Sequence, residues 1–124
     1  MSERKSIIKV KSFLFAIGVV QIYKSLVESK KEFILSKQLL RSGTAIGALV
    51  REAQNAESKA DFIHKLSIAQ KECDETIYWI ELLYQTKYMN QIEFEGMYNQ
   101  SNELLKMIRS AIITTKNNHL KNKS

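Results

Sequence analysis

Two glycines stand four residues apart in the stretch LLRSGTAIGALVREAQ, Leu39 to Gln54, with a serine and a threonine beside them. Glycine-rich loops of this kind can cradle a phosphate on backbone N–H groups at the start of a helix. A phosphate-binding P-loop also needs a preceding strand and a Gly-Lys-Ser/Thr ending, and GTAIGALV has neither. The dinucleotide-binding fingerprint fails for the same reasons. We therefore place Gly43 and Gly47 within a helix.

Histidine and acidic residues lack the spacing that metal sites in helical bundles use. Such sites are built from a Glu-x-x-His motif on each of two helices, with further glutamates. The nearest match is Asp61 to His64, and there is no second copy, so we expect no metal and no other cofactor. Helical ribonucleases of the HEPN type resemble one another in an arginine shortly before a histidine, a position that Lys59 occupies before His64. We interpret His64 as a polar surface or interface residue rather than a catalyst.

Cys73 is the single cysteine, so one chain can form neither an intramolecular disulfide nor a cysteine-based zinc site. Its place on an apolar helix face favours a buried, inert thiol over a nucleophile. We therefore expect a cytoplasmic protein that is not an enzyme, with no catalytic residue.

The apolar run Phe13 to Val20 follows a basic N-terminus and has the outline of a signal peptide. Helical periodicity continues beyond the run, without a small-residue cleavage site. The run is also shorter than the roughly 20 apolar residues of a transmembrane helix. No membrane association is predicted.

Helices must position all of these residues, because the chain has no proline, only four glycines and long segments of helical periodicity. Its 124 residues suit a single domain. The predicted helices cover about 6–28, 31–56, 59–88 and 91–117.

Ser58 is the predicted N-cap of the third helix, and a turn near Met89 and Asn90 precedes the fourth. Short connections make sequential helices antiparallel. We therefore predict an all-α fold, an up-down-up-down antiparallel four-helix bundle over residues 1–117. The basic tail 118–124 has no period and is predicted to be disordered.

The last three helices each carry a heptad seam of apolar or small residues, which is typical of a packed bundle. The seam residues are Leu35, Leu39, Ser42, Ile46, Leu49, Ala53 and Ala56, then Phe62, Leu66, Ala69, Cys73, Thr76, Ile80 and Leu83, then Phe94, Met97, Ser101, Leu104, Ile108, Ala111 and Thr115.

The first helix is apolar on nearly all sides, which in a monomeric bundle would leave an apolar face in water. This pattern predicts that a partner subunit covers the helix and that the protein is a homo-oligomer. Three lines of apolar residues run along it: Ile7, Val10, Leu14 and Ile17; Ile8, Phe15, Val19, Ile22 and Leu26; and Phe13, Ala16, Val20, Tyr23 and Val27.

Small and aromatic residues supply the candidates for close packing or a subunit interface. Gly43 and Gly47 share one helix face and can let another backbone approach closely, although a ligand contact or a kink is the alternative. Trp79 lies off the core seam, which favours an interface over base stacking or simple exposure. Phe13 and Phe15 of the first helix complete this set.

The net charge of +6 is concentrated near both chain ends. In an up-down-up-down bundle, the N-terminus, the turn between the second and third helices and the C-terminus share one end. The positive charge gathered at this end predicts that it binds phosphate backbones by counterion release. The alternative is that the charge only forms a solvated surface that keeps the protein soluble. The candidate nucleic-acid-binding residues are Arg51, Lys59 and Lys65, with Arg4, Lys5, Lys9, Arg109 and Lys116 adding charge.

The block from Gln38 to Leu83 resembles the small bacterial four-helix-bundle proteins encoded by intervening sequences within 23S ribosomal RNA genes. It is similar, more distantly, to the accessory variability protein of diversity-generating retroelements. The resemblance rests on RSGT at 41–44, IGA at 46–48, EAQ at 52–54, SKADF at 58–62 and YW at 78–79. Ala45 and Leu49 depart from the usual serine and asparagine.

This resemblance implies a ring-like homo-oligomer, commonly a pentamer, and a basic surface that binds nucleic acid in the retroelement relatives. We therefore expect an oligomeric helical protein that binds RNA or other nucleic acid, as an accessory to a ribonucleoprotein or retroelement. A protein-only scaffold that binds another protein is the alternative. Arg41 and Trp79 could be structural or could contact a partner.

Overall fold

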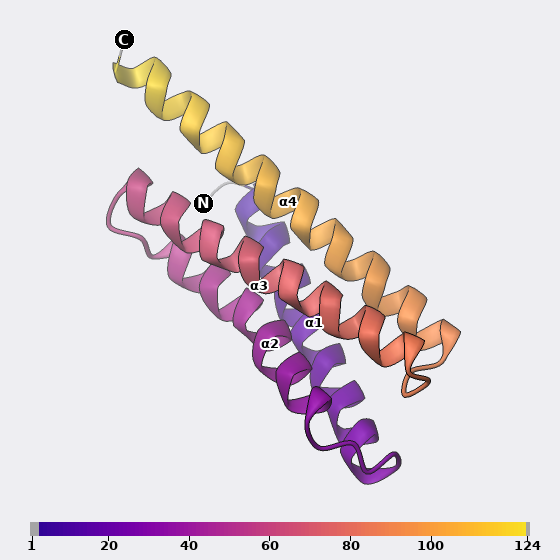
Figure 1. The fold of residues 1–124 in the computed structure, drawn as a ribbon. Coiled ribbons are helices and arrows are strands. Elements are labelled where there is room, and N and C mark those ends of the chain that lie inside the picture. Colours follow the sequence, from indigo (N-terminus) through magenta and orange to yellow (C-terminus); the bar gives the residue numbers. More distant parts are fainter. Residues whose placement is uncertain (1–2, 124) are drawn as a thin grey trace.

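The computed structural model describes the backbone of residues 3–123 and the side chains of residues 7–118, and its regular elements are all helical. Neighbouring helices run antiparallel (Figure 1), which confirms the predicted up-down bundle. Each helix packs on two others, and α1 meets α4 less extensively than the other neighbours meet. The helices are α1 (Glu3–Glu28), α2 (Leu35–Gln54), α3 (Lys59–Gln85) and α4 (Gln91–Lys123).

The core follows the predicted seams. In α3, the buried residues are the seven seam residues from Phe62 to Leu83. The seam of α2 is buried at four of its positions, while Leu35, Leu49 and Ala56 are half-buried. In α4, the seam is buried from Met97 to Ala111. Heptad spacing therefore identified the residues that hold the bundle together.

Helix α1 presents one of its three apolar lines to the core. Ile8, Phe15, Val19 and Leu26 are buried. Phe15, predicted as a close-packing or interface residue, is fully buried and packs within its own bundle. The apolar line that begins at Ile7 faces outward, and its four side chains have exposed fractions of 40% to 57%. These outward residues are Ile7, Val10, Leu14 and Ile17.

The two glycines of α2 face α1 at short distance. A Cβ built on Gly43 would stand 2.7 Å from Cγ2 of Val19, and one on Gly47 would stand 3.2 Å from the carbonyl oxygen of Ser12. Real Cβ atoms essentially never approach other atoms as closely as the first distance. The absence of two side chains therefore sets the separation of α1 and α2.

Helix α2 begins at Leu35, four residues later than the predicted start at Lys31. Lys31 takes a left-handed backbone conformation, φ 55°, that a right-handed helix cannot include. The Glu32 carboxylate then accepts hydrogen bonds from the N–H groups of Ile34, Leu35 and Ser36, at 3.1, 2.9 and 2.6 Å. Burial raises the pKa of Glu32, but these hydrogen bonds outweigh burial and the pKa is lowered.

Helix α3 is capped at its start as predicted, because the Ser58 hydroxyl accepts from the Asp61 N–H at 3.0 Å. It ends at Gln85, before the predicted Tyr88. Lys87 has a φ of 68°, and the Tyr88 N–H turns back to donate to the carbonyl of Leu83 at 2.9 Å. A left-handed residue of this kind commonly ends a helix and is usually glycine. Because the residue here is a lysine, the sequence did not indicate that the helix ends at this point.

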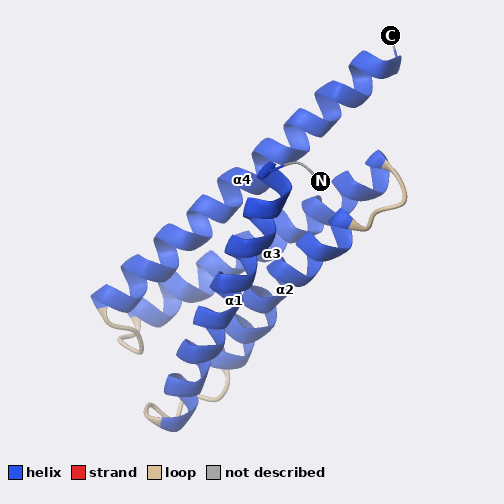
Figure 2. Ribbon diagram, turned by 180° about the vertical axis from the view of Figure 1, so that it is seen from behind, coloured by secondary structure: helices blue, strands red, loops and turns tan. Residues whose placement is uncertain are grey.

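Helix α4 begins at the predicted turn. Asn90 and Glu93 cap each other, with the Glu93 N–H donating to the Asn90 side chain at 2.8 Å and the Asn90 N–H donating to the Glu93 carboxylate at 3.0 Å. The helix then continues to Lys123, which corrects its predicted end at Asn117 and the predicted disorder of residues 118–123. Ser124, the last residue of the predicted tail, lies outside the described residues. No glycine or proline lies between Asn117 and Lys123 to end the helix. As a result, α4 projects beyond the other helices (Figure 2).

Replacing Gly43 with alanine tests the close approach. A helical glycine-to-alanine change favours the helix by up to about 1 kcal/mol, whereas overpacking against Val19 costs about 1 to 3 kcal/mol. We expect Gly43→Ala to lower the free energy of unfolding by about 1 kcal/mol in urea titrations. Gly96→Ala is the matched control, since nothing lies within 4 Å of its Cβ. It should raise stability, and equal effects of the two changes would contradict the close approach.

Candidate nucleic-acid interface

The start of α1, the turn between α2 and α3 and the far part of α4 lie at one end of the bundle (Figure 1). This arrangement brings the predicted basic residues of three segments toward that end. Lys59 and Lys116 are exposed, and Lys9 is half-buried. None of these three makes an ion pair with another described side chain. Arg4 and Lys5 lie outside the residues whose side chains the structure describes.

Carboxylates neutralise part of the predicted basic set. Lys65 is bonded to Glu52 across α3 and α2 at 3.5 Å, and it is half-buried. Arg109 lies 4.0 Å from Asp74, which stands midway along α3 and therefore back from the end. Both side chains therefore already lie near a carboxylate, so they are weaker candidates for phosphate contact than the sequence indicated.

Arg51 has a different partner. Its guanidinium lies over the ring of Phe13, 5.0 Å from the ring centre, in a cation–π contact between α2 and α1. Both side chains remain exposed. Arg51 therefore lies where the outward apolar face of α1 meets the basic end. Phe13, predicted as a close-packing or interface residue, is half exposed on this face.

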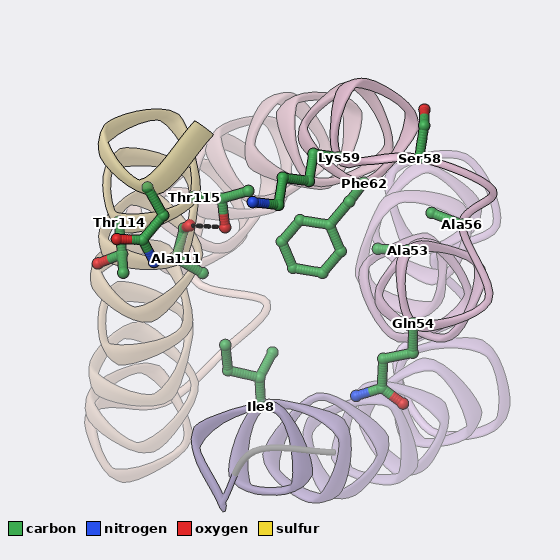
Figure 3. A pocket seen from close by; sticks show the side chains of 11 residues that line it. Ile8, Ala53, Gln54, Ala56, Ser58, Lys59, Phe62, Ala111, Thr114 and Thr115 are labelled. Carbon is green, nitrogen blue, oxygen red and sulfur yellow. Dashed lines mark hydrogen bonds between the residues drawn. The ribbon is translucent and has the colours of Figure 1, made fainter. Parts of the chain in front are cut away.

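A cavity of about 650 Å³ opens at the basic end, among all four helices (Figure 3). Its inner wall is apolar and includes Ile8, Phe62 and Ala111. Figure 3 shows the Phe62 ring pointing into the space and the Lys59 side chain crossing above it toward α4. The remaining lining residues are Ala53, Gln54, Ala56, Ser58, Thr114, Thr115 and Asn118.

Small residues in the last layer of the core explain this cavity. Where the seams of α2 and α4 approach the basic end, they supply Ala53, Ala56 and Ala111. These methyl groups fill too little of the space between four helices, so the layer stays open. The sequence analysis assigned Phe62 to the core and did not predict the cavity. The alanines that the seams of α2 and α4 place in one layer could have indicated it.

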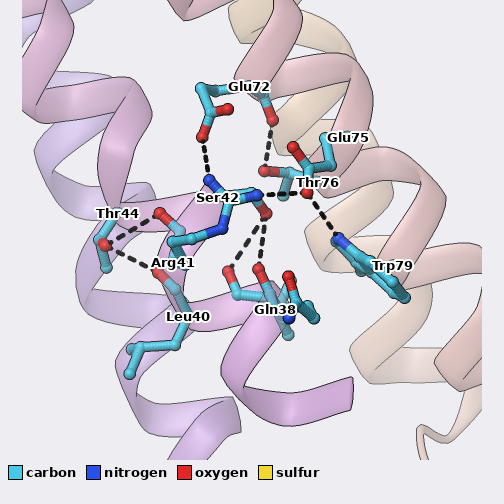
Figure 4. A network of polar contacts seen from close by, with 10 residues as sticks. Gln38, Leu40, Arg41, Ser42, Thr44, Glu72, Glu75, Thr76 and Trp79 are labelled. Carbon is cyan, nitrogen blue, oxygen red and sulfur yellow. Dashed lines mark hydrogen bonds and ion pairs between the residues drawn. The ribbon is translucent and has the colours of Figure 1, made fainter. Parts of the chain in front are cut away.

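Arg41 and Trp79, the two residues whose role was open, belong to one polar cluster between α2 and α3 (Figure 4). Arg41 donates to Glu72 at 2.9 Å and also pairs with Glu75. The Trp79 indole N–H donates to the same Glu75 carboxylate at 3.2 Å. The hydrogen bond from Arg41 is the main cause that lowers the pKa of Glu75. Both residues therefore have a structural role.

Groups able to do covalent or metal chemistry are scarce in the described part of the chain. No cluster of three or more His, Cys, Asp or Glu residues there could hold a metal ion. Burial raises the pKa of the Cys73 thiol to about 12, and this thiol donates to the carbonyl of Ser101 at 3.2 Å. His64 is exposed on α3. What these surfaces offer is positive charge, an apolar face and a cavity.

Within the described residues, one helix is long and apolar enough to cross a membrane on length and composition alone. The segment Ile7–Glu28 has 22 residues and a mean hydropathy of 1.5. The expectation that the apolar run is too short to span a membrane is corrected to this extent. Core helices of soluble proteins and N-terminal signal sequences meet the same criteria.

Comparisons with known proteins place the chain among related bundles. Residues 4–110 match a family described as the 23S rRNA-intervening sequence protein. A crystal structure of a protein of unknown function, from the S23 ribosomal protein family of Bacteroides thetaiotaomicron VPI-5482, is similar, with 50% sequence identity and a TM-score of 0.86. The match covers 88% of this chain and 97% of that one. No curated protein matches.

The Arg41 cluster predicts a pH-dependent contribution to stability. The pKa of Glu75 is lowered in the folded state, so its contribution is complete above the ordinary value of 4.5 and is lost as the pH falls through the lowered pKa. Arg41→Gln should reduce the free energy of unfolding by about 0.5 kcal/mol at neutral pH, since the pair is largely exposed. Urea titrations should show this deficit shrinking as the pH is lowered below 4.5 and through the lowered pKa of Glu75.

Lys37→Gln serves as the control, because Lys37 is exposed on the same helix, one turn earlier, without an ion pair among the described side chains. It should change stability little at either pH. A deficit of Arg41→Gln that stays constant down to low pH would contradict a role of the ionised Glu75.

Proposed function

Because the chain belongs to the 23S rRNA-intervening sequence protein family, we propose that it is a cytoplasmic, non-enzymatic homo-oligomer that binds RNA or other nucleic acid. It would bind through the basic end, as an accessory factor to a ribonucleoprotein or retroelement. The observation that carries the proposal is the convergence of Lys9, Lys59 and Lys116 at one end, without carboxylate partners among the described side chains.

Electrostatics supports phosphate binding in preference to reading of sequence. Lysine side chains that are not engaged by carboxylates can release the counterions condensed on a nucleic acid, and this release drives association without base contacts. Arg51 adds a guanidinium that is exposed although it lies over Phe13. Lys65 and Arg109 contribute less, because Glu52 and Asp74 already lie against them.

The outward face of α1 supports self-association. Ile7, Val10, Leu14 and Ile17 form a continuous line at helical spacing, with Phe13 beside it, and about half of each side chain is exposed. Covering such a half contributes roughly 1 kcal/mol per side chain. A second copy supplies a matching apolar face, and the family resemblance favours a pentameric ring. Around a ring, the basic ends would form one positive rim.

A protein-only scaffold is the second candidate, and the ion pairs favour it. Lys11, Lys65 and Arg109 are each engaged with a carboxylate of a neighbouring helix. On this alternative, the remaining lysines keep the protein soluble and the exposed faces bind another protein. The two candidates differ in whether the protein binds nucleic acid at low salt.

Binding across a salt series tests the first candidate. We expect affinity for RNA, single-stranded DNA or duplex DNA to fall steeply with salt. Changing Lys59→Glu together with Lys116→Glu should weaken binding and reduce the slope of log affinity against log salt by about 1 for each lysine that contacts a phosphate. Fluorescence anisotropy with labelled oligonucleotides measures both quantities.

The matched control is Lys24→Glu with Lys30→Glu, which makes the same change of net charge at the opposite end of the bundle. It should affect binding much less. Equal losses in the two double variants would show that only the net charge matters. Absence of binding to all three nucleic acids at low salt would refute the proposal and leave the scaffold.

Self-association has its own prediction. The wild-type mass in solution should be a multiple of the 14.3-kDa chain, five times for a pentamer. Val10→Glu with Leu14→Glu should shift the mass toward the monomer, because carboxylates cannot be buried unpaired in an apolar interface. Light scattering measures the mass, and circular dichroism checks that the helices persist.

Ile92→Glu is the control for this change, since Ile92 is the most exposed large apolar residue among the described side chains and lies at the opposite end. It should leave the mass unchanged. A wild-type protein that is monomeric at high concentration would overturn the oligomer.

A further inference from the structure

The end of α4 extends beyond the rest of the bundle (Figure 2). Ile112 is the last buried residue among the described side chains, and the six residues from Ile113 to Asn118 are exposed or half-buried. Successive residues of an α-helix are rotated by about 100°, so six residues point in every direction around the axis. Beyond Ile112, therefore, no side of the helix is buried in the bundle. The projecting segment, residues 113–123, is about 16 Å long at 1.5 Å per residue.

The formal charges of the projecting segment are all positive. Its sequence contains Lys116, Lys121 and Lys123, and no acidic residue follows Glu103 in the sequence. Lys116 is exposed and makes no ion pair with another described side chain. The segment therefore has the charge that an anionic partner requires, whereas the basic end of a second copy would repel it.

The projecting segment also has no apolar face. Leu120 is the one apolar residue in the sequence from Thr114 to Lys123, and the others are lysine, asparagine, threonine or histidine. A helix that docks in an apolar groove or lies in a membrane surface needs an apolar stripe at helical spacing. A helix of this length is marginal in water on its own. The partner that would cover this segment is therefore both anionic and polar.

Shape selects among nucleic acids. An α-helix with its side chains is about 10 to 12 Å across, and the major groove of B-form DNA is about 12 Å wide and about 8.5 Å deep. The minor groove of B-form DNA is only about 6 Å wide, and the major groove of duplex RNA is too narrow for side chains to read. Only a helix that is free on all sides can enter a groove, because a neighbouring helix would strike the phosphate strands. The end of α4 meets this condition.

We propose that the projecting end of α4 enters the major groove of B-form duplex DNA, with Lys116 on a phosphate at the edge of the groove. The inference rests on the proposed binding of nucleic acid at this end, and it names the form that is bound and the element that binds it. Lysine contacts to phosphates fix the position of a protein on a duplex and carry no sequence information. The helix would therefore select the form of the nucleic acid by groove width.

Duplex DNA and duplex RNA of one sequence and length carry the same charge and differ in groove shape. Wild-type protein should bind the DNA duplex about tenfold more tightly by fluorescence anisotropy, because only its major groove admits a helix. Equal affinity for the two duplexes, or a preference for RNA or for single strands, would overturn the inference while sparing the proposed function. Failure of every nucleic acid to bind would remove both.

Asn117→Pro and Asn117→Ala form a matched pair of variants, since neither alters the charge. Proline removes a hydrogen bond within the projecting helix and disrupts it, whereas alanine favours the helix. Asn117→Pro should bind duplex DNA about tenfold more weakly than Asn117→Ala and should bind duplex RNA equally well. Asn117 lies beyond the last buried residue, so both variants should keep the bundle, which thermal unfolding checks. Equal affinities of the two variants for duplex DNA would contradict the inference.

Dimethyl sulfate footprinting of duplex DNA with wild-type protein supplies a test that needs no substitution. The reagent methylates N7 of guanine, which lies in the major groove, and N3 of adenine, which lies in the minor groove. At saturating protein, guanine N7 should be protected and adenine N3 should stay reactive. Protection of adenine N3 alone, or of neither atom, would overturn the groove assignment and leave the proposed binding of nucleic acid standing.

Discussion

The close approach of α1 to α2 is the constraint from which the other features of the bundle follow. It depends on the missing side chains at Gly43 and Gly47, against which Val19 and the backbone of Ser12 rest. With α1 fixed in this rotation, the line through Ile8, Phe15 and Val19 faces the core. The opposite line then faces solvent, which leaves a monomer with an apolar surface.

Helix positions and core residues were predictable because heptad spacing is a property of the sequence alone. The buried set of α3 follows its seam at all seven positions, from Phe62 to Leu83. Helix ends were less predictable. Lys31 and Lys87 adopt left-handed conformations that their residue type does not indicate, and Glu32 caps α2 from outside the usual N-cap position.

The candidate site was predictable as a region and not as a set of contacts. Topology placed the chain ends and the turn between α2 and α3 together, and it drew Lys59 and Lys116 to that end. Sequence could not show that Lys65 and Arg109 face carboxylates, because partners across helices depend on the rotation and stagger of each pair. The cavity was not predicted for a related reason. Its size depends on side chains from all four helices together, whereas the sequence pattern of each helix, considered separately, predicted a filled core.

The two ends of the bundle differ in how they are closed. At the end opposite the cavity, tight turns fasten α1 to α2 and α3 to α4, with backbone bonds returning to Leu26 and Leu83. At the cavity end, alanines leave the last layer thin, and α4 continues alone. Local opening free energies follow buried contact, so they should decrease along the bundle. Thermal fluctuations should therefore open the cavity end before the opposite end, with α1 and α4 separating more readily there than α2 and α3, which a turn connects.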